Sequence, residues 1–141
     1  MIEIKVKLAR QGAKLPTRAH DTDAGWDLYA DYDFQLGFME IDRVNTGVKV
    51  AIPAGYYGQI VGRSGLAAKG ILVHQGTIDS GYRGESKVVV QSLGTMTRCK
   101  IERGNRIAQL LILPVPEVKW TEVDSLDETD RGTNGFGSTG R

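Results

Sequence analysis

Cysteine and histidine are scarce in this chain of 141 residues, which contains only Cys99, His20 and His74 of these two types. One cysteine excludes an internal disulfide, and two imidazoles are too few for a zinc centre of the usual composition. A single thiol in such a chain is typical of a small buried hydrophobic residue, and we expect this of Cys99. The length is sufficient for one domain that buries its own core.

An excess of charge of either sign is also missing. The 18 Lys and Arg residues nearly balance the 17 Asp and Glu residues, for a formal net charge of +1. This balance leaves no excess of positive charge with which to bind nucleic acid, so any anion must be recognised by individually placed residues. No apolar run approaches a membrane span, and residues 1–5 are not a signal peptide. We expect a soluble cytoplasmic protein (nuclear, or in the host cytosol, for a eukaryotic or viral source) that binds neither nucleic acid nor membrane.

Amphipathic helical segments are almost absent, which excludes a doubly wound α/β fold. Short β-type segments separated by turn residues predict an all-β barrel or sandwich instead. Strands are expected over residues 2–8, 26–30, 44–52, 56–61, 71–73, 85–92, 95–101, 106–113 and 118–123. The one expected helix covers residues 64–70, with Ser64 as its cap and Gly70 at its end. Residues 1–123 then form the domain, and residues 124–141 form an acidic linker with a flexible glycine-rich arm.

Residues 76–85 predict a β-hairpin with a carboxylate and an aromatic ring at its mouth. A Ser-Gly dipeptide supplies the turn, for which Gly81 can adopt a positive φ. Asp79 and Tyr82 flank this turn, and such a pair can hold a flat polar ligand by ring contact and proton transfer. A surface hairpin with a merely polar turn is the alternative for this segment taken alone. A second hairpin turn is expected at residues 102–105.

Three further features suit a phosphate ligand. Arg63, Ser64 and Gly65 place a guanidinium, a hydroxyl and free N–H groups at the start of the expected helix, although an ordinary capped helix is the alternative. Gln109 is a polar amide in an apolar strand, and it either meets a ligand phosphate or faces outward. Asp27 is either a surface residue or a carboxylate near a metal-bound phosphate, since Mg²⁺ on phosphates keeps several waters.

The C-terminal stretch 131–140 combines Arg131, Ser138 and Thr139 with several glycines. Guanidinium and hydroxyl groups on such a chain suit wrapping around phosphoryl oxygens. Phe136 lies among glycines and has no neighbours with which to form a core. A disordered tail is the alternative, and both descriptions hold if the segment becomes ordered only over a bound ligand.

Five segments resemble, in order, the five motifs of the trimeric dUTPase family, and together they span nearly the whole chain. They are residues 24–30 (AGWDLYA), 62–70 (GRSGLAAKG), 76–85 (GTIDSGYRGE), 104–110 (GNRIAQL) and 131–140 (RGTNGFGSTG). Any one of them is a weak signal, whereas five in the same order are highly specific. The resemblance implies a homotrimer of distorted jelly-roll subunits, with active sites shared between chains.

The resemblance also implies a reaction, the hydrolysis of dUTP to dUMP and pyrophosphate with Mg²⁺ on the triphosphate. This reaction limits uracil incorporation into DNA and supplies dUMP for thymidylate synthesis. By resemblance, Asp79 activates the water that attacks the α-phosphorus, Tyr82 excludes a 2′-hydroxyl, and Asp27 binds waters of the Mg²⁺ shell. The other implied substrate-binding residues are Arg63, Ser64, Gly65 and Gln109 on the phosphates, Arg131, Ser138 and Thr139 on the terminal phosphate, Phe136 over the uracil, and Gly76, Ile78 and Gly137.

Residues 71–76 depart from the pattern of many family members. The segment is shorter here, and Val73 falls near the position at which those members carry an asparagine that reads the uracil edge. Base recognition is then expected to rest on backbone groups of the hairpin, helped by His74 or Gln75. Of these two side chains, His74 is better explained as a structural residue.

Two other functions compete with dUTP hydrolysis. The related dCTP deaminases share the fold and several motifs, but they use a glutamate on the strand after the hairpin, where this sequence has Val89. A non-catalytic trimer that binds nucleotide and signals to a partner protein is the second alternative. The presence of Asp79 argues against it, because holding phosphates requires no base.

Overall fold

The computed structural model describes residues 1–94 and 98–135, and within them the chain forms eleven strands and one helix. The strands are β1 (Lys5–Leu8), β2 (Trp26–Tyr29), β3 (Phe34–Leu36), β4 (Ile41–Asn45), β5 (Val48–Ala51), β6 (Tyr56–Val61), β7 (Ile71–His74), β8 (Gly76–Ile78), β9 (Lys87–Ser92), β10 (Cys99–Ile101) and β11 (Arg106–Pro114). The helix α1 (Ser64–Ala67) is a single turn. The all-β prediction is confirmed. No helix in the described ranges has the length and apolar character needed to span a bilayer.

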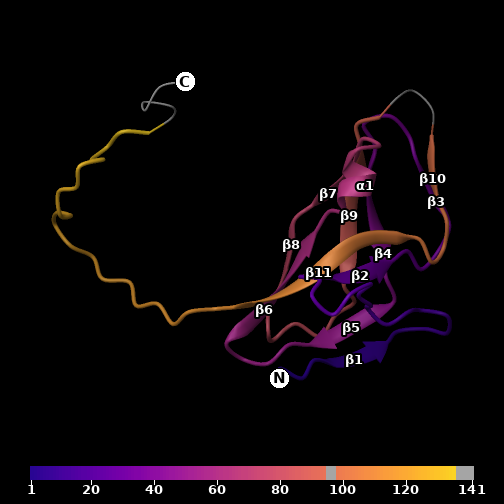
Figure 1. Cartoon of the computed structure of the whole chain (residues 1–141), viewed down its shortest axis with the longest axis horizontal. Helices are drawn as coiled ribbons and strands as arrows, with labels where there is room; N and C mark the ends of the chain where they lie inside the picture. The colour runs from indigo at the N-terminus through magenta and orange to yellow at the C-terminus, as the bar shows by residue number, and fades with distance from the viewer. Residues whose placement is uncertain (95–97, 136–141) are drawn as a thin grey trace.

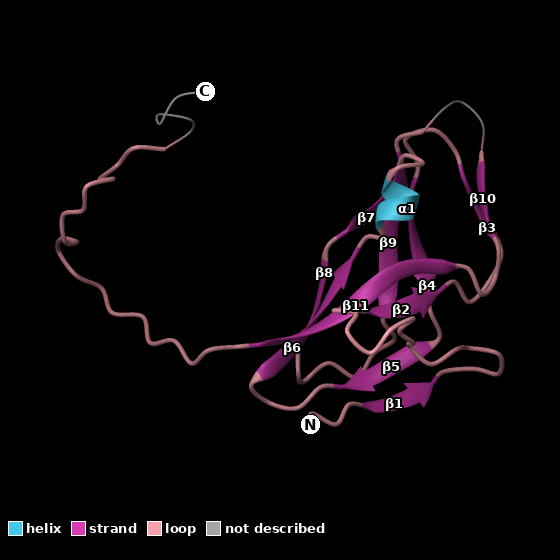
Figure 2. Ribbon diagram, in the orientation of Figure 1, coloured by secondary structure: helices cyan, strands magenta, loops and turns pink. Residues whose placement is uncertain are grey.

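The strands form four small antiparallel sheets around a common core (Figure 1). The largest has the order β2-β11-β6-β8, the next has the order β4-β9-β7, and the pairs β1-β5 and β10-β3 complete the body (Figure 2). Most paired strands are far apart in the sequence, so the chain crosses repeatedly from one sheet to another, as it does in a jelly roll. This is the distorted jelly roll that the resemblance implies.

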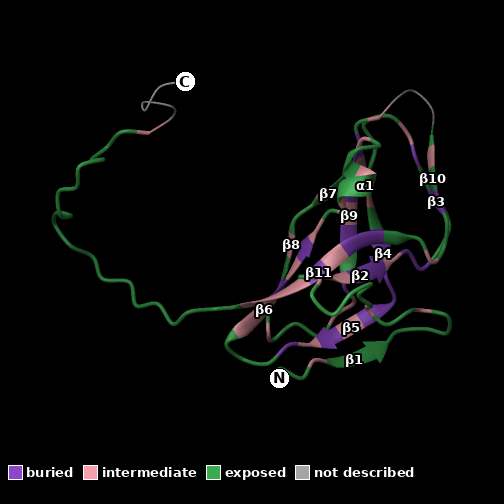
Figure 3. Ribbon diagram, viewed as in Figure 1, coloured by how far each residue is buried: buried purple, intermediate pink, exposed green. Residues whose placement is uncertain are grey.

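The core is built from alternate residues of the strands, because successive side chains of a strand point to opposite faces. In β9, Val88 and Val90 are buried, and β5 buries Val48 and Val50 in the same way. The largest fully buried side chains are Leu28, Leu36, Ile71 and Ile107. Cys99 is partly buried and packs against this core, close to what we expected. Figure 3 shows the buried segments gathered inside the body.

The hairpin expected over residues 76–85 is wrong. β8 pairs with β6, whereas β9 pairs with β4 and β7, so the segment between β8 and β9 connects two different sheets. Its turn is closed by the Tyr82 N–H, which donates to the Asp79 carbonyl at 3.0 Å. Gly81 is not among the described glycines with positive φ, so this turn does not need the glycine for its backbone angles. Alternation along a strand predicts the strand but not its partner, which is why the pairing was missed.

Two other strand predictions fail for related reasons. The turn at residues 102–105 is present, with Gly104 at a φ of +82°, but β10 pairs with β3 and β11 with β2 and β6. The strand expected over residues 44–52 is split at Gly47 into the end of β4 and the whole of β5, which belong to different sheets. Gly47 has a φ of +70°, a conformation that turns the chain out of the extended region.

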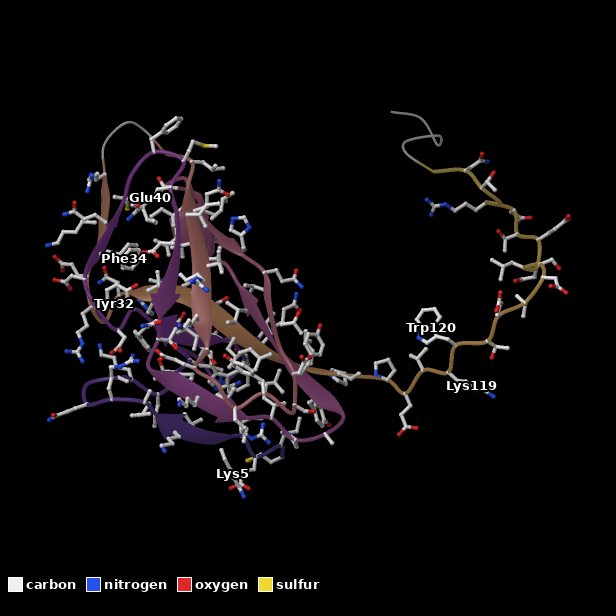
Figure 4. The ribbon with its side chains drawn as sticks, turned by 180° about the vertical axis from the view of Figure 1, so that it is seen from behind. Lys5, Tyr32, Phe34, Glu40, Lys119 and Trp120 are labelled. Carbon is white, nitrogen blue, oxygen red and sulfur yellow. The ribbon has the colours of Figure 1, made fainter. Side chains whose placement is uncertain are left out.

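The segment after β11 leaves the body as an extended arm, which is visible in Figure 1. Residues 118–123 contain no strand, so that prediction is also wrong, and Trp120 is 91% exposed. Figure 4 shows Lys119 and Trp120 on the arm, away from the body. Among the residues that the structure describes, this stretch has no neighbouring strand with which to pair, and an isolated β-type segment is unstable in water.

Replacement of Gly47 by alanine should destabilise the fold more than the same change at Gly55. Both glycines have positive φ, at +70° and +83°, which costs an alanine about 1–2 kcal/mol. A Cβ at Gly47 would also overlap Ala13 and contact Asp31, whereas a Cβ at Gly55 meets nothing within 4 Å. Such overpacking adds roughly 1–3 kcal/mol. Urea unfolding of G47A and G55A measures the difference, and equal losses of stability would contradict the prediction.

Candidate functional site

Three of the predicted phosphate-binding and metal-binding residues meet at one end of the four-stranded sheet. Gln109 of β11 lies directly opposite Asp27 of β2 on one side and Val61 of β6 on the other. Directly opposed residues share a face of the sheet, so the Gln109 amide and the Asp27 carboxylate project to the same side. Arg63 follows the end of β6, and its Nε lies 3.0 Å from Asp27 Oδ1. The register of β11 therefore assembles this group.

Asp27 is buried, with 6% of its surface exposed, so the interpretation of Asp27 as a surface residue is wrong. A second arginine also contacts it, since Arg106 Nη1 donates to Asp27 Oδ2 at 3.4 Å. Arg63 in turn donates from Nη1 to the Arg106 carbonyl at 3.3 Å. Two guanidinium groups around one carboxylate leave this end of the sheet with positive charge. The sequence indicated no role for Arg106, because a bulge in β11 next to it determines where its side chain reaches.

Helix α1 leaves Ser64 and Gly65 exposed beside Arg63. Arg63, and not Ser64, is the N-cap residue, and among the described residues no side-chain hydrogen bond caps the helix, so the capping role expected of Ser64 is wrong. One helical turn has little macrodipole, and any anion here would be held by individual N–H and hydroxyl groups. A Cβ at Gly65 would meet no atom of the described residues within 4 Å. Packing within one chain therefore does not explain the glycine, whereas close approach of a ligand or a second chain would.

Asp79 lies just after β8 and is exposed to solvent. It borders a cavity of about 330 Å³ whose lining includes Tyr56, Tyr57 and residues 115–117. This volume is near the lower limit of about 300 Å³ for small-molecule sites. The aromatic rings and the carboxylate at this cavity supply flat apolar contact and a proton acceptor in one place.

Tyr82 is on the same turn as Asp79 and is 46% exposed. Its hydroxyl donates to the Glu85 carbonyl at 3.2 Å, so the ring folds back over the end of its own segment. Gly84 makes this possible, because a Cβ there would overlap the phenol ring. The predicted proximity of Asp79 and Tyr82 is therefore present, although it arises from a connection between sheets and not from a hairpin.

The two groups of candidate residues are apart within one chain. Ile78 lies opposite Gly58 on β6, and Gln109 lies opposite Val61 on the same strand. Three residues of an extended strand span roughly 10 Å at ~3.3 Å per residue. Asp79 continues beyond Ile78 in one direction, and Arg63 lies beyond Val61 in the other, so the gap between the Asp79 turn and the Arg63 group is larger still.

The remaining predicted residues differ in burial and in their distance from these two groups. Ile78 is 4% exposed and belongs to the core, so only its backbone is available to a ligand, and Gly76 lies in the same strand. Arg131 is exposed on the arm, where its Nε donates to the Asn134 carbonyl at 3.2 Å. His74 Nε2 lies 3.0 Å from Gln91 Oε1, in keeping with a structural role. The expectations for Phe136, Gly137, Ser138 and Thr139 fall on residues outside the described ranges.

Glu85 is held by contacts that the sequence did not indicate. Arg10 binds it with both terminal nitrogens, at 3.0 Å to Oε1 and 2.8 Å to Oε2, and the Gly47 N–H donates to Oε1 at 2.8 Å. The hydrogen bond from Arg10 lowers the pKa of Glu85, against the opposing effect of burial. Arg10 and Glu85 are 75 positions apart, so no local pattern could have joined them.

Comparisons with known proteins agree with this fold. The architecture defines the class as an all-β jelly-roll protein. Residues 11–140 match the family model described as dUTPase. The chain therefore belongs to the dUTPase family.

Individual relatives are similar over most of their length. The chain is 52% identical over 134 residues to a deoxyuridine 5'-triphosphate nucleotidohydrolase of Mycolicibacterium gilvum (strain PYR-GCK), which covers 89% of this chain and 87% of the relative. A variant of the dUTPase of Staphylococcus bacteriophage 80alpha, solved with dUpNHpp, has a TM-score of 0.92 at 29% identity and covers 99% of both chains. A dUTPase variant from phage phi11 of S. aureus, in which coordination of a structural Mg(II) ion is described, has a TM-score of 0.82 at 26% identity, with coverage of 87% and 97%.

Stability should fall at acid pH in a way that depends on Glu85. Its pKa is lowered in the folded state from 4.5, so the ionised form contributes stability above that unfolded value, and this is lost as the pH falls through the lower folded value. The E85Q variant has no carboxylate at this position and therefore lacks this pH-dependent contribution to stability. Urea unfolding from pH 7 to pH 3 should show a wild type that is more stable than E85Q at neutral pH and a difference that shrinks below the unfolded value. Parallel curves at all pH values would contradict this.

Proposed function

We propose that the protein hydrolyses dUTP to dUMP and pyrophosphate as a homotrimer with shared active sites. Family membership supports this reaction, and the observation that carries it is the turn that joins Asp79 to Tyr82 beside a cavity. Water attacks the α-phosphorus, and the bond from this phosphorus to the oxygen that bridges to the β-phosphorus breaks, so pyrophosphate leaves. Asp79 accepts the proton of the attacking water. Such chemistry depends mainly on positioning and charge neutralisation.

The phosphates would be held by the group at the end of the four-stranded sheet. Arg63 contributes its guanidinium, Ser64 its hydroxyl, Gly65 its backbone N–H and Gln109 its side-chain amide. Arg63 is only 28% exposed and is already oriented by Asp27 before any ligand binds. An arginine that is fixed in advance loses less side-chain entropy on binding an anion.

Asp27 also fits the place where a Mg²⁺ ion on the triphosphate would be bound through water. Its Oδ1 is buried and accepts no well-formed hydrogen bond from the described chain, although Arg63 Nε is 3.0 Å away. Within the described ranges no group of three or more His, Cys, Asp or Glu residues is placed to hold a metal. Triphosphate oxygens would therefore supply most of the ligands, and the bound ion would neutralise phosphate charge. From this chain, the Asp27 carboxylate would contribute to Mg²⁺ binding by accepting hydrogen bonds from the waters on the ion.

The base and sugar would bind along the free edge of β8. This strand is the last of its sheet and, in the part of the chain that the structure describes, pairs with β6 alone, so backbone N–H and C=O groups on its other edge would be available to the uracil. Gly76 and Ile78 provide these groups, as the resemblance implies. Tyr82 stands beyond them, where its exposed ring can lie against the deoxyribose and leave no room for a 2′-hydroxyl.

A shared site explains why the candidate residues are separated in one chain. The Asp79 turn and the Arg63 group lie at opposite ends of β6, and the arm that carries Arg131 extends away from both (Figure 1). A trimer would join the Asp79 turn of one copy to the Arg63 group of a second and the arm of a third. The arm would bring Arg131, Ser138 and Thr139 to the terminal phosphate, with Phe136 and Gly137 over the uracil. The domain then comprises residues 1–123, and residues 124–141 act as linker and closing arm.

Asp79→Asn should lower turnover severely while nucleotide binding survives. Loss of a general base costs typically about 10²–10⁴-fold in rate. Pyrophosphate release from dUTP, dCTP, dTTP and UTP is measured with Mg²⁺ for the wild type, D79N and the control D124N, and each base is monitored for deamination. Release from dUTP alone by wild type and D124N is expected. Ammonia from dCTP would indicate a deaminase, and tight binding of dUTP without turnover by the wild type would indicate a nucleotide sensor.

Deletion of residues 131–141 should leave the trimer folded and lower turnover by on the order of 10²-fold, since the phosphate clamp and the cover over the base are lost. Sedimentation analysis reports the oligomeric state, and steady-state kinetics report turnover. Thr121→Ala, an exposed arm residue outside the five motifs, is the control. A truncated protein with the wild-type rate would contradict the closing role of the arm.

A further inference from the structure

The segment from Asp79 to Glu85 is fixed to the body mainly at its two ends. Its internal hydrogen bonds are local, because Tyr82 bonds to Asp79 and Glu85, and Arg83 donates from Nη1 to the carbonyls of Ser80 and Tyr82 at 2.6 and 2.8 Å. Residues 79 and 81–83 are exposed. The orientation of the turn therefore depends on where β8 ends and on what holds Glu85.

Glu85 is held by a polar network from distant parts of the chain. Arg10 binds both of its carboxylate oxygens, and the same guanidinium also binds Asp31, whose side chain is 3% exposed. The next residue, Ser86, is fixed on the backbone, with its N–H donating to the Val48 carbonyl at 2.7 Å and its carbonyl accepting from Thr46 Oγ1 at 2.6 Å. The Glu85 side chain and the peptide unit that joins Glu85 to Ser86 thus form one rigid point at the end of the exposed turn.

Tyr82 depends directly on this rigid point. Its hydroxyl donates to the main-chain carbonyl of Glu85, the residue whose side chain Arg10 holds. The acceptor that sets the position of the phenol ring is therefore supported on two sides, by the Ser86 N–H of the same peptide unit and by the Glu85 side chain, and loss of the Arg10 contact would remove the second support. Because the Tyr82 N–H closes the turn onto the Asp79 carbonyl, the resulting shift would reach the carboxylate at position 79.

We propose that Arg10 and Glu85 are positioning residues for sugar discrimination, because their bidentate ion pair fixes the turn that carries Tyr82. This inference rests on the proposed function, in which Tyr82 excludes a 2′-hydroxyl. Neither residue touches the substrate. A bidentate arginine–carboxylate contact specifies orientation as well as distance, which a lysine at position 10 would not do.

The test compares R10Q, E85Q and the double variant R10Q/E85Q with the wild type, using kcat/KM for dUTP and for UTP. If the pair positions Tyr82, each single variant should lower the ratio of kcat/KM for dUTP to kcat/KM for UTP by roughly tenfold, because a full 1 Å misplacement costs about 10²-fold and the Ser86 peptide contact limits the shift. The double variant should be no worse than R10Q, because R10Q already loses both the Glu85 and the Asp31 contacts of Arg10. The control is E102Q, which removes the exposed Lys100–Glu102 pair and should leave the ratio unchanged.

A merely structural role predicts a different result. In that case kcat/KM for dUTP and for UTP would fall in equal proportion, and this outcome would overturn the inference. A double variant whose loss is the product of the two single losses would show that Arg10 and Glu85 act independently, which would overturn it too. If a glutamine variant fails to fold, the same kcat/KM ratio is measured for R10K and Y82F instead. R10K retains the charge but not the bidentate contact, and Y82F removes only the hydroxyl bonded to Glu85, so both should lower the ratio. A wild type that hydrolyses no dUTP would instead refute the proposed function.

Discussion

Strand β11 pairs with β2 along one edge and with β6 along the other, and both groups of candidate site residues depend on this double pairing. It places Gln109 between Asp27 and the end of β6, from which Arg63 follows. On its other edge β6 carries β8, which leads to Asp79. A slip of one residue would turn Gln109 to the opposite face, where Ala108 and Leu110 are now buried. The apolar residues that flank Gln109 therefore secure the register on which the polar group depends.

The positions of strands could be predicted from the sequence more readily than their partners. Tyr56–Val61 forms a strand over the predicted residues, and the all-β class followed from the lack of amphipathic helices. Both expected hairpins failed, because in a jelly roll a tight turn often joins strands of different sheets. Pairing is a property of the packed core, and a local pattern of residues carries little information about it. The stretch 118–123 shows the same limit, since it was expected to form a strand but pairs with no strand among residues 1–94 and 98–135.

The candidate site was predictable only as far as its residues lie within motifs. Asp27, Arg63 and Gln109 are far apart in the sequence, and only the resemblance to a known family placed them together. The contact of Arg106 with Asp27 depends on a bulge in β11, and the contact of Arg10 with Glu85 depends on loops that meet around Gly47. Interactions of this kind arise from tertiary structure alone. They involve arginines, whose long side chains reach partners that strand register does not specify.

In the proposed function, phosphate binding requires both ordered arginine side chains and positive charge, and the contacts of Arg63 and Arg106 with Asp27 provide both. An exposed arginine binds a phosphate strongly but must give up about 2 kcal/mol of rotamer entropy when it does so. A buried carboxylate between Arg63 and Arg106 orders both side chains in advance, and because one negative charge faces two positive ones, the site keeps positive charge for the ligand. Replacing Asp27 by a neutral residue would raise that charge yet release the side chains. Preorganisation, rather than maximal charge, is therefore the property that this arrangement of residues favours.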